Sequence, residues 1–442
     1  MRKSKCARGT ILAAALALAI PPAARAQDQP PADLSRSPVR LSQLIEEVRR
    51  ANPETRAAGR RSDAALEMES QEGAFEDPMV RLSYSPRPAG MRGTGFLVEQ
   101  AIPFWGVRGL KGEAARERAR GMEGESRAQA LDAVAQAQRV FHEWLLARRG
   151  RELNQNVRSI LEQFKSIAEQ RYRAGLVPQS DPLRAAAELS RLAVLDEEFL
   201  RAEGSARAQV NLLLGREPLS ALGDPEDLSY VLAELPEEGL LEQALEHRPE
   251  VGAARARLRE WEARETLSRR AYWPDFTVGA EYKPKALAGS QAQMGGDYDD
   301  MVSVMLGFNL PLQVGAKNAA AREASFEREA AEFELEASKQ RALFEVRAQY
   351  LALRQARKTF ELYRNEIVPA TKLALDATRR SYENDRAAFV ELLDAERTYQ
   401  DVLFEESRAL HGYHAGLVDI ERATGAPPGH HHGNPSEKGE VP

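Results

Sequence analysis

The stretch EQAIPFWGVRGLKGEAARERAR, Glu99–Arg120, joins two kinds of chain end to end. At its start, the segment GFLVEQAI alternates apolar and polar residues, which is the period-two pattern of a β-strand; after Gly106 comes a long Ala/Glu/Arg-rich run with helical character. Pro103 ends a strand ladder because it has no N–H, and Gly106 lets the backbone turn. The stretch therefore predicts a strand that passes directly into a helix.

Alternation of this kind predicts four strands, at about 78–86, 95–103, 274–283 and 301–311. In the last of them one face carries the apolar side chains of Val302, Val304, Leu306, Phe308 and Leu310. Strands of about ten residues with this pattern fit a soluble sandwich as well as a membrane β-barrel. The pattern alone leaves both architectures open.

The chain contains two copies of one unit. ANPETRAAG is echoed by HRPEVGAAR, QAIPFWGVRG by NLPLQVGAKN, YRAGLVPQSDPLRA by YENDRAAFVELLDA, and VNLLLGREP by IERATGAPP. Echoes in the same order indicate a duplication, with a first repeat at 41–215, a linker at 216–237 and a second repeat at 238–425. The second repeat has the longer hairpin loop, GSQAQMGGDYDD (Gly289–Asp300), which we interpret as a surface loop.

Each repeat is predicted to run helix, two strands, very long helix, turn and helix, with the turns at about 172–182 and 382–390. The long helices would extend over about 106–174 and 316–385, and seventy helical residues reach about 100 Å. Coiled-coil spacing is present in Leu153, Val157, Ile160, Phe164 and Ile167, and in Leu343, Val346, Tyr350 and Leu353. Pro369 interrupts the second long helix, so we expect a bend there.

Four strands cannot close a barrel, and lipid does not tolerate an open sheet edge. If the strands span a membrane, two chains must pool eight of them or three chains twelve. Aromatic rings favour the membrane interface, and Phe104 and Trp105 follow a strand at the point where it would leave the bilayer.

The N-terminus has the pattern of an exported precursor. The basic segment MRKSKCARG precedes the apolar run TILAAALALAI and a cleavage site at Ala24-Arg25-Ala26, so residues 1–26 are expected to be a signal peptide and 27–40 a linker. This apolar run is well short of the roughly 20 residues that span a bilayer, and no later stretch is long enough. Cys6, the only cysteine, would leave with the signal, so the mature chain would have neither disulfide nor thiolate chemistry.

The formal net charge is −6, and cleavage of residues 1–26 would remove basic residues only. This acidic balance argues against nucleic acid as a partner and is compatible with cations. A composition rich in Ala, Glu, Arg and Leu with 7% aromatic residues favours long helices.

The duplicated NPE/RPE helices, the paired hairpins, QAIPFWG, the two tip segments and NLLLG, in this order, resemble the TolC family of outer-membrane efflux proteins. The resemblance implies an α+β membrane protein, a trimer in which four strands per protomer form a twelve-stranded barrel continuous with a long periplasmic α-helical barrel. It implies an exit duct in the outer membrane of a Gram-negative bacterium, with a large periplasmic portion. The implied partners are outer-membrane lipid, a periplasmic adaptor and an inner-membrane pump of the RND type.

DPMVRLSYSPRP followed by QAIPFWGVRGLKGE looks most like the heavy-metal efflux branch of that family. The resemblance also assigns residues at the periplasmic tip. Glu391 and Asp394, three residues apart on one helix face, would form two stacked acidic rings around the aperture. A solvated acidic patch is the plain alternative.

The first-repeat counterpart, Asp181, matches an acidic residue with which the family latches the closed tip. Its expected basic partner falls at Ala387, so the adjacent Arg386 is the candidate, and Asp385 replaces a glycine of the tip. These departures put the latch in question. The bend expected to contact the adaptor contains Arg173, Gly175, Leu176 and Ser180.

No nucleophile elbow, Walker loop, Rossmann fingerprint or HExxH motif is present, so we expect neither an enzyme nor a cofactor. His430, His431 and His432 lie in a Pro/Gly-rich tail at 426–442 that we predict to be disordered, without the ligand spacing of a metal site. Two alternatives remain: a type I secretion duct of the same family, and a periplasmic coiled-coil structural or adaptor protein whose strands form a soluble module.

Overall fold

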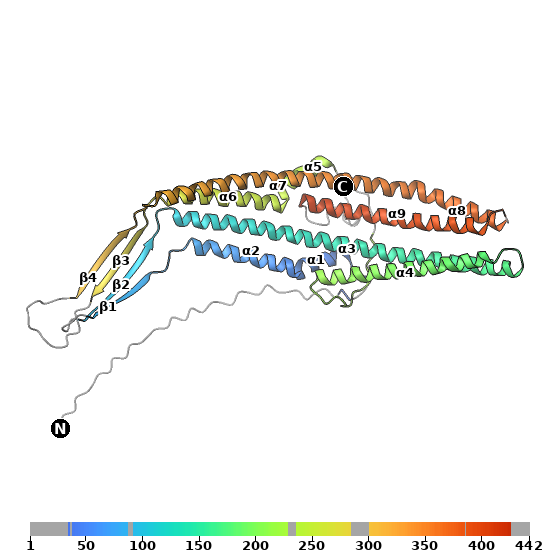
Figure 1. The fold of residues 1–442 in the computed structure, drawn as a ribbon, viewed down its shortest axis with the longest axis horizontal. Helices are drawn as coiled ribbons and strands as arrows, with labels where there is room; N and C mark the ends of the chain where they lie inside the picture. Colours follow the sequence, from blue (N-terminus) through green and yellow to red (C-terminus); the bar gives the residue numbers. More distant parts are fainter. Residues whose placement is uncertain are drawn as a thin grey trace, which may run out of the picture. The chain divides into compact units, whose positions relative to one another are not determined.

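The same series of elements occurs twice along the chain in the computed structural model (Figure 1). The first series is α1 (Leu41–Ala51), α2 (Pro53–Glu72), β1 (Met79–Pro86), β2 (Arg92–Ile102), α3 (Val107–Arg173) and α4 (Ser180–Leu213). The second is α5 (Glu237–His247), α6 (Pro249–Arg270), β3 (Phe276–Lys283), β4 (Met301–Phe308), α7 (Val314–Leu362), the π-helical turn η1 (Tyr363–Ile367), α8 (Val368–Glu383) and α9 (Phe389–Thr424).

The structure describes residues 34–35, 38–86, 92–228, 236–283, 300–384 and 386–425. The predicted signal peptide at 1–26, most of the linker at 27–40, the loop from 289 to 299 and the histidine tail at 426–442 lie outside the described residues. All described residues belong to one unit, Leu34–Pro442. Within the described part of the chain, no helix has an apolar stretch long enough to cross a bilayer.

The four strands form one antiparallel sheet in the order β1-β2-β3-β4. The central pair, β2 and β3, joins the two repeats, with Val98 opposite Ala280. β2 ends at Ile102, directly before Pro103, and β4 ends at Phe308, before the predicted end at 311. β2 leaves its ladder at Pro103, which has no N–H to donate, whereas the ladder of β4 ends at Phe308, before Pro311 is reached.

Each long helix carries two shorter ones end to end along its side (Figure 1). α2 and α4 both pack on α3, α6 packs on both α3 and α7, and α9 packs on α7, α8 and α3. In the first repeat the start of α2 meets the end of α4: a Cβ at Gly215 would come within 2.8 Å of Pro53 Cγ. In the second repeat a Cβ at Gly425 would come within 2.8 Å of Arg248 Cα. In each repeat, therefore, the NPE or RPE motif at the start of one helix contacts the glycine that ends another helix.

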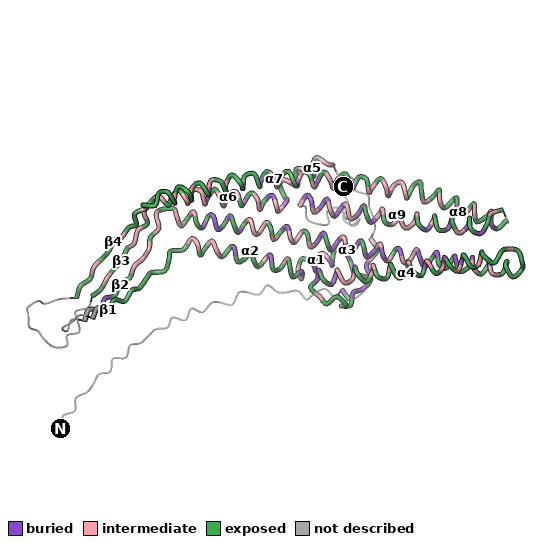
Figure 2. Tube along the Cα trace, in the orientation of Figure 1, coloured by how far each residue is buried: buried purple, intermediate pink, exposed green. Residues whose placement is uncertain are grey.

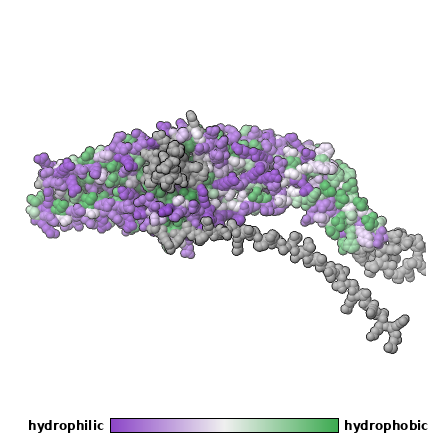
Figure 3. All heavy atoms as spheres, turned by 180° about the vertical axis from the view of Figure 1, so that it is seen from behind, coloured by the Kyte–Doolittle hydropathy of each residue, from purple (hydrophilic) through white to green (hydrophobic). Residues whose placement is uncertain are grey.

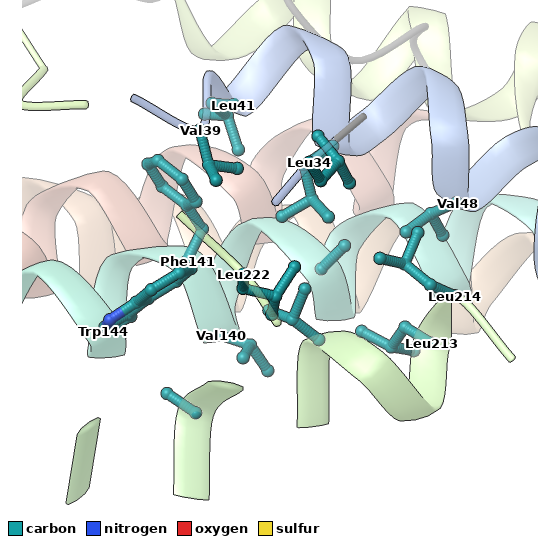
Figure 4. Close-up of a cluster of buried hydrophobic side chains, with 14 of the residues drawn as sticks. Leu34, Val39, Leu41, Val48, Val140, Phe141, Trp144, Leu213, Leu214 and Leu222 are labelled. Carbon is teal, nitrogen blue, oxygen red and sulfur yellow. The ribbon is translucent and has the colours of Figure 1, made fainter. Parts of the chain in front are cut away.

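Apolar side chains gather in three clusters. The first belongs to the first repeat alone and contains side chains from α1, α3, α4 and the segment after α4, among them Trp144, Phe141 and Leu41 (Figure 4). The second belongs to the second repeat alone and contains Tyr413 and Leu417. The third lies between the two helical hairpins near their turns and draws on both repeats. Buried residues recur along the helices, whereas the described strand residues are mostly exposed or intermediate (Figure 2).

The predicted seam of α3 is partly wrong. Val157 and Phe164 are buried, but Ile160 and Ile167 are 36% and 45% exposed in the single chain. Leu161 and Ala168 are buried instead. Each follows one of the predicted positions by one residue, because this face of α3 packs against α4 and the second repeat. In α7, Val346 and Leu353 of the predicted seam are buried.

The second long helix is interrupted as predicted near Pro369, and the interruption is a π-helical turn, η1, directly before it. A proline cannot donate the usual backbone hydrogen bond and crowds the preceding turn, and a wider turn relieves both problems. Pro369 then lies in the first turn of α8, where the missing N–H is tolerated.

Candidate functional site: an apolar sheet face and two helical turns

One face of the sheet is apolar from edge to edge. The pairing registers place Val80 opposite Val98, Val98 opposite Ala280 and Ala280 opposite Val304. These side chains are exposed rather than covered, with Val80 68% and Val304 78% exposed. The same face carries the polar Gln100, opposite Val278. Its other members are Leu82, Phe96, Ile102, Phe276, Val278, Tyr282, Val302, Leu306 and Phe308. Figure 3 shows hydrophobic residues gathered at this end of the described unit.

The opposite face is mainly polar or small. Arg81 pairs with Glu99 at 3.4 Å across β1 and β2, and Lys283 pairs with Glu281 at 2.9 Å on β3. Ser83, Gly95, Thr277, Gly279, Ser303 and Gly307 lie on this face, together with the apolar Met79, Leu97, Ala101, Met301 and Met305. A sheet with one apolar and one polar face suits lipid on one side and water on the other.

Aromatic rings cluster where the sheet meets the helices. The Phe104 ring stacks on Trp273 with centroids 5.1 Å apart, and Trp105 contacts Phe276 edge-on at 5.7 Å. The Phe104 N–H donates to Asp275 Oδ1 at 2.8 Å, and Gly106 begins the turn into α3 with φ 86°. Sequence reasoning identified Phe104 and Trp105 but missed Trp273 and Phe276.

A signal for the missed rings was present. The segment WPDF precedes the third strand, while PFWG follows the second, and antiparallel strands bring the end of one beside the start of the next. The β2–β3 register therefore unites aromatic residues from the two repeats at one level of the sheet.

The turn between α3 and α4 is exposed except at Val177, which is half-buried. The N–H of Gly175, at φ 72°, donates to Tyr172 O at 2.9 Å, and the N–H of Leu176 donates to Arg171 O at 2.9 Å. This is a glycine-closed helix end, and it leaves Leu176 72% exposed. The predicted docking residues Arg173, Gly175, Leu176 and Ser180 all lie on the surface of this turn.

The turn between α8 and α9 contains the predicted aperture residues. Glu391 and Asp394 are both exposed in the first turns of α9. Arg386 is exposed, and its N–H donates to Ser381 O at 2.8 Å. Asp181 is half-buried at the start of α4, where Ser180 Oγ donates to its carboxylate at 3.3 Å. Asp385 lies outside the described residues.

The latch and the rings are not assembled within one chain. Among the residues that the structure describes, no hydrogen bond or ion pair joins Asp181 to Arg386. The assignments of Glu391, Asp394, Asp181 and Arg386 therefore stay predictions, as do those of the docking turn.

Near the two turns, an ion pair joins the α3–α4 hairpin to the α8–α9 hairpin. Glu188 of α4 accepts hydrogen bonds from Arg397 of α9 at 2.5 Å and from Arg191 at 2.6 Å. Burial by itself would raise the pKa of Glu188, but the two guanidinium groups outweigh it and hold the pKa below its usual value. Two residues beyond Asp394, burial raises the pKa of Glu396.

The described residues contain no group of three or more His, Cys, Asp or Glu side chains that could hold a metal ion. Three buried histidines do lie together between α3 and α9, but the rings of His142 and His414 stack at an interplanar angle of 18° rather than converge on a point. Sequence reasoning missed this cluster, because His142 is distant in sequence from His411 and His414.

Comparison with known proteins supports the same fold. Residues 240–426 match the family model "Outer membrane efflux protein", whereas no curated protein matches the sequence. The structure is similar to that of the outer-membrane channel OprN, with a TM-score of 0.75 at 20% identity over 88% of this chain and 90% of that one.

The outer membrane protein VceC from Vibrio cholerae gives a TM-score of 0.75 at 18% identity over 87% of this chain and 96% of that one. CusC, whose structures describe transmembrane channel formation, gives 0.74 at 17% identity over 88% and 92%. The family model covers the second repeat and the structural likeness covers both repeats. The second repeat thus resembles the outer membrane efflux protein family, and the chain shares the fold of OprN, VceC and CusC over both repeats.

Proposed function

We propose that this protein is the outer-membrane exit duct of a tripartite efflux system, which conducts substrates passively from a pump and an adaptor across the outer membrane. The observation that carries the proposal is the four-stranded sheet with an exposed apolar face, which passes directly into helices of exceptional length. Soluble proteins rarely leave so continuous an apolar surface uncovered. Lipid would cover it here.

The assembly we propose is a homotrimer with a twelve-stranded barrel. Within the single chain β1 and β4 are the two edges of the sheet, and lipid does not tolerate unpaired edges. β4 of one copy would pair with β1 of the next. α7 supports this reading, because Phe326, Phe333 and Phe344 are 66%, 75% and 71% exposed along it and offer a neighbouring copy an apolar surface.

We propose that the aperture lies at the end of the helices far from the sheet, at the two helical turns. In a trimer, Glu391 and Asp394 would form two acidic rings that attract cations and bind multivalent ones. The exposed turn with Leu176 would meet the periplasmic adaptor, and Asp181 with Arg386 would form the latch, between copies rather than within one chain.

The sequence has no Walker loop, and the driving force would come from an inner-membrane pump, of the RND type by the family resemblance. The protein would lie in the outer membrane of a Gram-negative bacterium, with the helices in the periplasm and with no nucleic acid as partner. Heavy-metal ions stay the proposed substrate class on the sequence motifs alone, since OprN, VceC and CusC match this chain at similar identity.

The test is single-channel conductance of detergent-purified protein in a planar bilayer, with cation and anion selectivity measured separately. Discrete, long-lived, cation-selective steps are expected. A silent bilayer would first be repeated with Asp181→Ala in the tip. Continued silence from protein that also stays monodisperse without detergent would overturn the channel and favour a periplasmic coiled-coil protein.

A further inference from the structure

The helices next to the sheet follow the order of its strands. α2 leads into β1, β2 passes into α3, α6 leads into β3, and β4 passes into α7 (Figure 1). Among these four helices, α3 packs on α2 and α6, and α6 packs on α3 and α7. The two inner helices therefore have a neighbour on each side, whereas α2 and α7 end the series as β1 and β4 end the sheet.

Neighbours in this series run in opposite directions. α2 and α6 each precede a strand and run toward the sheet, while α3 and α7 each follow a strand and run away from it. A helix that continued the series beyond α7 would therefore run toward the sheet. α2, at the other end of the series, has this direction.

α7 has apolar side chains on two opposite sides. The side that packs within the chain buries Leu335, Val346 and Leu353. The opposite side carries a second apolar series at steps of three and four residues, interrupted by Gln340. Its members are Phe326, Ala330, Phe333, Ala337, Phe344, Ala348 and Leu351. This spacing is that of a helix–helix contact, yet in the single chain the three phenylalanines are 66–75% exposed. We call this series the phenylalanine row.

α2 has a free side of matching period. Ala58, Ser62 and Ala65 are its buried residues, on the side that packs within the chain. The opposite side carries five exposed residues, again at steps of three and four: Ala57, Arg60, Ala64, Glu67 and Gln71. The two alanines leave room for aromatic rings, and the aliphatic parts of the longer side chains can cover those rings.

Ion pairs show which residues of α2 and α7 lie at the same distance from the sheet. Across the series, the pairs at one level are Glu69–Arg116, Glu117–Arg259 and Arg257–Glu334. Glu69 of α2 and Glu334 of α7 are the two ends of this level. Gln71 lies two residues from Glu69, and Phe333 lies one residue from Glu334, so both are within about 3 Å of the level along the helix axes.

We propose that the phenylalanine row of α7 packs on the free side of α2 of a second copy, antiparallel, with Phe333 beside Gln71. Copies in a closed ring are related by rotation without translation, so each residue keeps its level in every copy. Antiparallel helices advance equally in opposite directions, and the same register therefore places Phe344 beside Arg60. The inference rests on the proposed function, because it names the helical surfaces that meet in the proposed ring.

Cysteine cross-linking of the detergent-purified protein tests the register. Gln71→Cys and Phe333→Cys are combined with Cys6→Ser, which removes the only native cysteine, and the protein is treated with bis-maleimidoethane. Within one chain α3 and α6 separate the two positions, so a link joins two copies. Because axes of packed helices lie about 8–10 Å apart, the reagent reaches across the contact, and covalent dimers and trimers are expected.

The matched control combines Gln71→Cys with Leu351→Cys. Leu351 belongs to the same row but lies about 27 Å further along α7 than Phe333, so this pair is expected to link at least roughly tenfold less. The two pairs differ only in the level of the second cysteine.

Substitutions in the row supply a second measurement, by light scattering of the detergent-solubilised protein. Phe333→Ser with Phe344→Ser is expected to raise the concentration at which the trimer dissociates at least roughly tenfold, because it removes two aromatic anchors from each contact. Phe333→Leu with Phe344→Leu keeps apolar side chains and is expected to dissociate at a concentration closer to that of wild type. Both rings are exposed in the single chain, so these changes leave its interior packing in place.

The outcomes separate this inference from the proposed function. A trimer in which the Gln71 and Phe333 positions link no better than the control pair would overturn the inference alone. The same holds for a trimer that dissociates at the wild-type concentration after both substitutions to Ser. A protein that is monomeric in detergent and in lipid would overturn the proposed function, and this inference with it.

Discussion

The side chain of Asn52 closes two helices at once. Its Oδ1 accepts a hydrogen bond from the N–H of Thr55 in the first turn of α2, while its Nδ2 donates to the carbonyl of Leu213 at the end of α4, each at 2.9 Å. One buried amide thus satisfies backbone groups of two helices whose sequences are far apart. It links the end of α4 to the start of α2, where the two helices lie end to end along α3.

Asn52→Ala is therefore expected to lower the free energy of unfolding by about 1–2 kcal/mol, because it removes an N-cap and leaves the Leu213 carbonyl without this donor. Urea denaturation followed by far-UV circular dichroism measures it. Gln43→Ala, at an exposed position of α1, is the control and should stay within about 0.5 kcal/mol of wild type. Equal stabilities for Asn52→Ala and the control would contradict the capping role.

Gly425→Ala tests the corresponding junction of the second repeat. Gly425 has φ 72°, and an added Cβ would come within 2.8 Å of Arg248 Cα, so the substitution combines backbone strain with a collision against another backbone. We expect a loss of about 2 kcal/mol or more in the free energy of unfolding.

The matched control for that change is Gly252→Ala in α6, where an added Cβ meets no atom within 4 Å. This substitution is expected to stabilise the protein by about 0.5–1 kcal/mol, since alanine favours a helix interior. If both alanine variants shift the denaturation midpoint in the same direction, the close approach at Gly425 is not the cause.

The double substitution Glu391→Gln with Asp394→Asn tests the proposed aperture. Removing both carboxylates is expected to reduce the cation-to-anion permeability ratio at least roughly twofold and to relieve block by multivalent cations. Single-channel recordings in a planar bilayer measure both quantities. Asp401→Asn, another exposed acid of α9, should leave them unchanged; unaltered selectivity and block in the double variant would remove the two residues from the aperture.

The Glu188 carboxylate is expected to make the free energy of unfolding depend on pH in the acidic range. Its pKa in the folded protein lies below the ordinary value of 4.5, because the hydrogen bonds of Arg397 and Arg191 outweigh the effect of burial. The unfolded chain is therefore protonated first, and the stabilisation by this carboxylate, complete above pH 4.5, is lost as the pH falls further.

Urea denaturation at pH 7 and at pH 3.5 measures that effect. Glu188→Gln is expected to be less stable than wild type at pH 7 and to lose less stability on going to pH 3.5. Glu242→Gln, an exposed acid of α5, serves as the comparison. A Glu188→Gln variant with the wild-type pH slope would show that the Arg397 contact carries no pH dependence.

By itself, the sequence determined the features that depend on a local side-chain periodicity, on a proline or glycine at one position, or on a repeated motif. Alternation predicts four strands, the uninterrupted Ala/Glu/Arg runs predict the long helices, Pro103 with Gly106 predicts the change from strand to helix, and the duplicated motifs predict two repeats. The structure contains each of these elements, with strand ends that differ by a few residues. Local sequence suffices here because the period of a side-chain pattern and the missing N–H of a proline act within a few residues.

Tertiary structure alone decided which distant residues meet. The β2–β3 pairing brings Trp273 onto Phe104, the choice of neighbour turns the buried stripe of α3 away from Ile160, and the packing of α9 on α3 gathers His142 with His411 and His414. A local sequence pattern does not reveal these contacts, because each depends on how two separate elements pack against each other. The physical reason is that apolar side chains are buried only when two faces pack together. One segment therefore shows that it has an apolar face, but only the assembled fold shows which face packs against it.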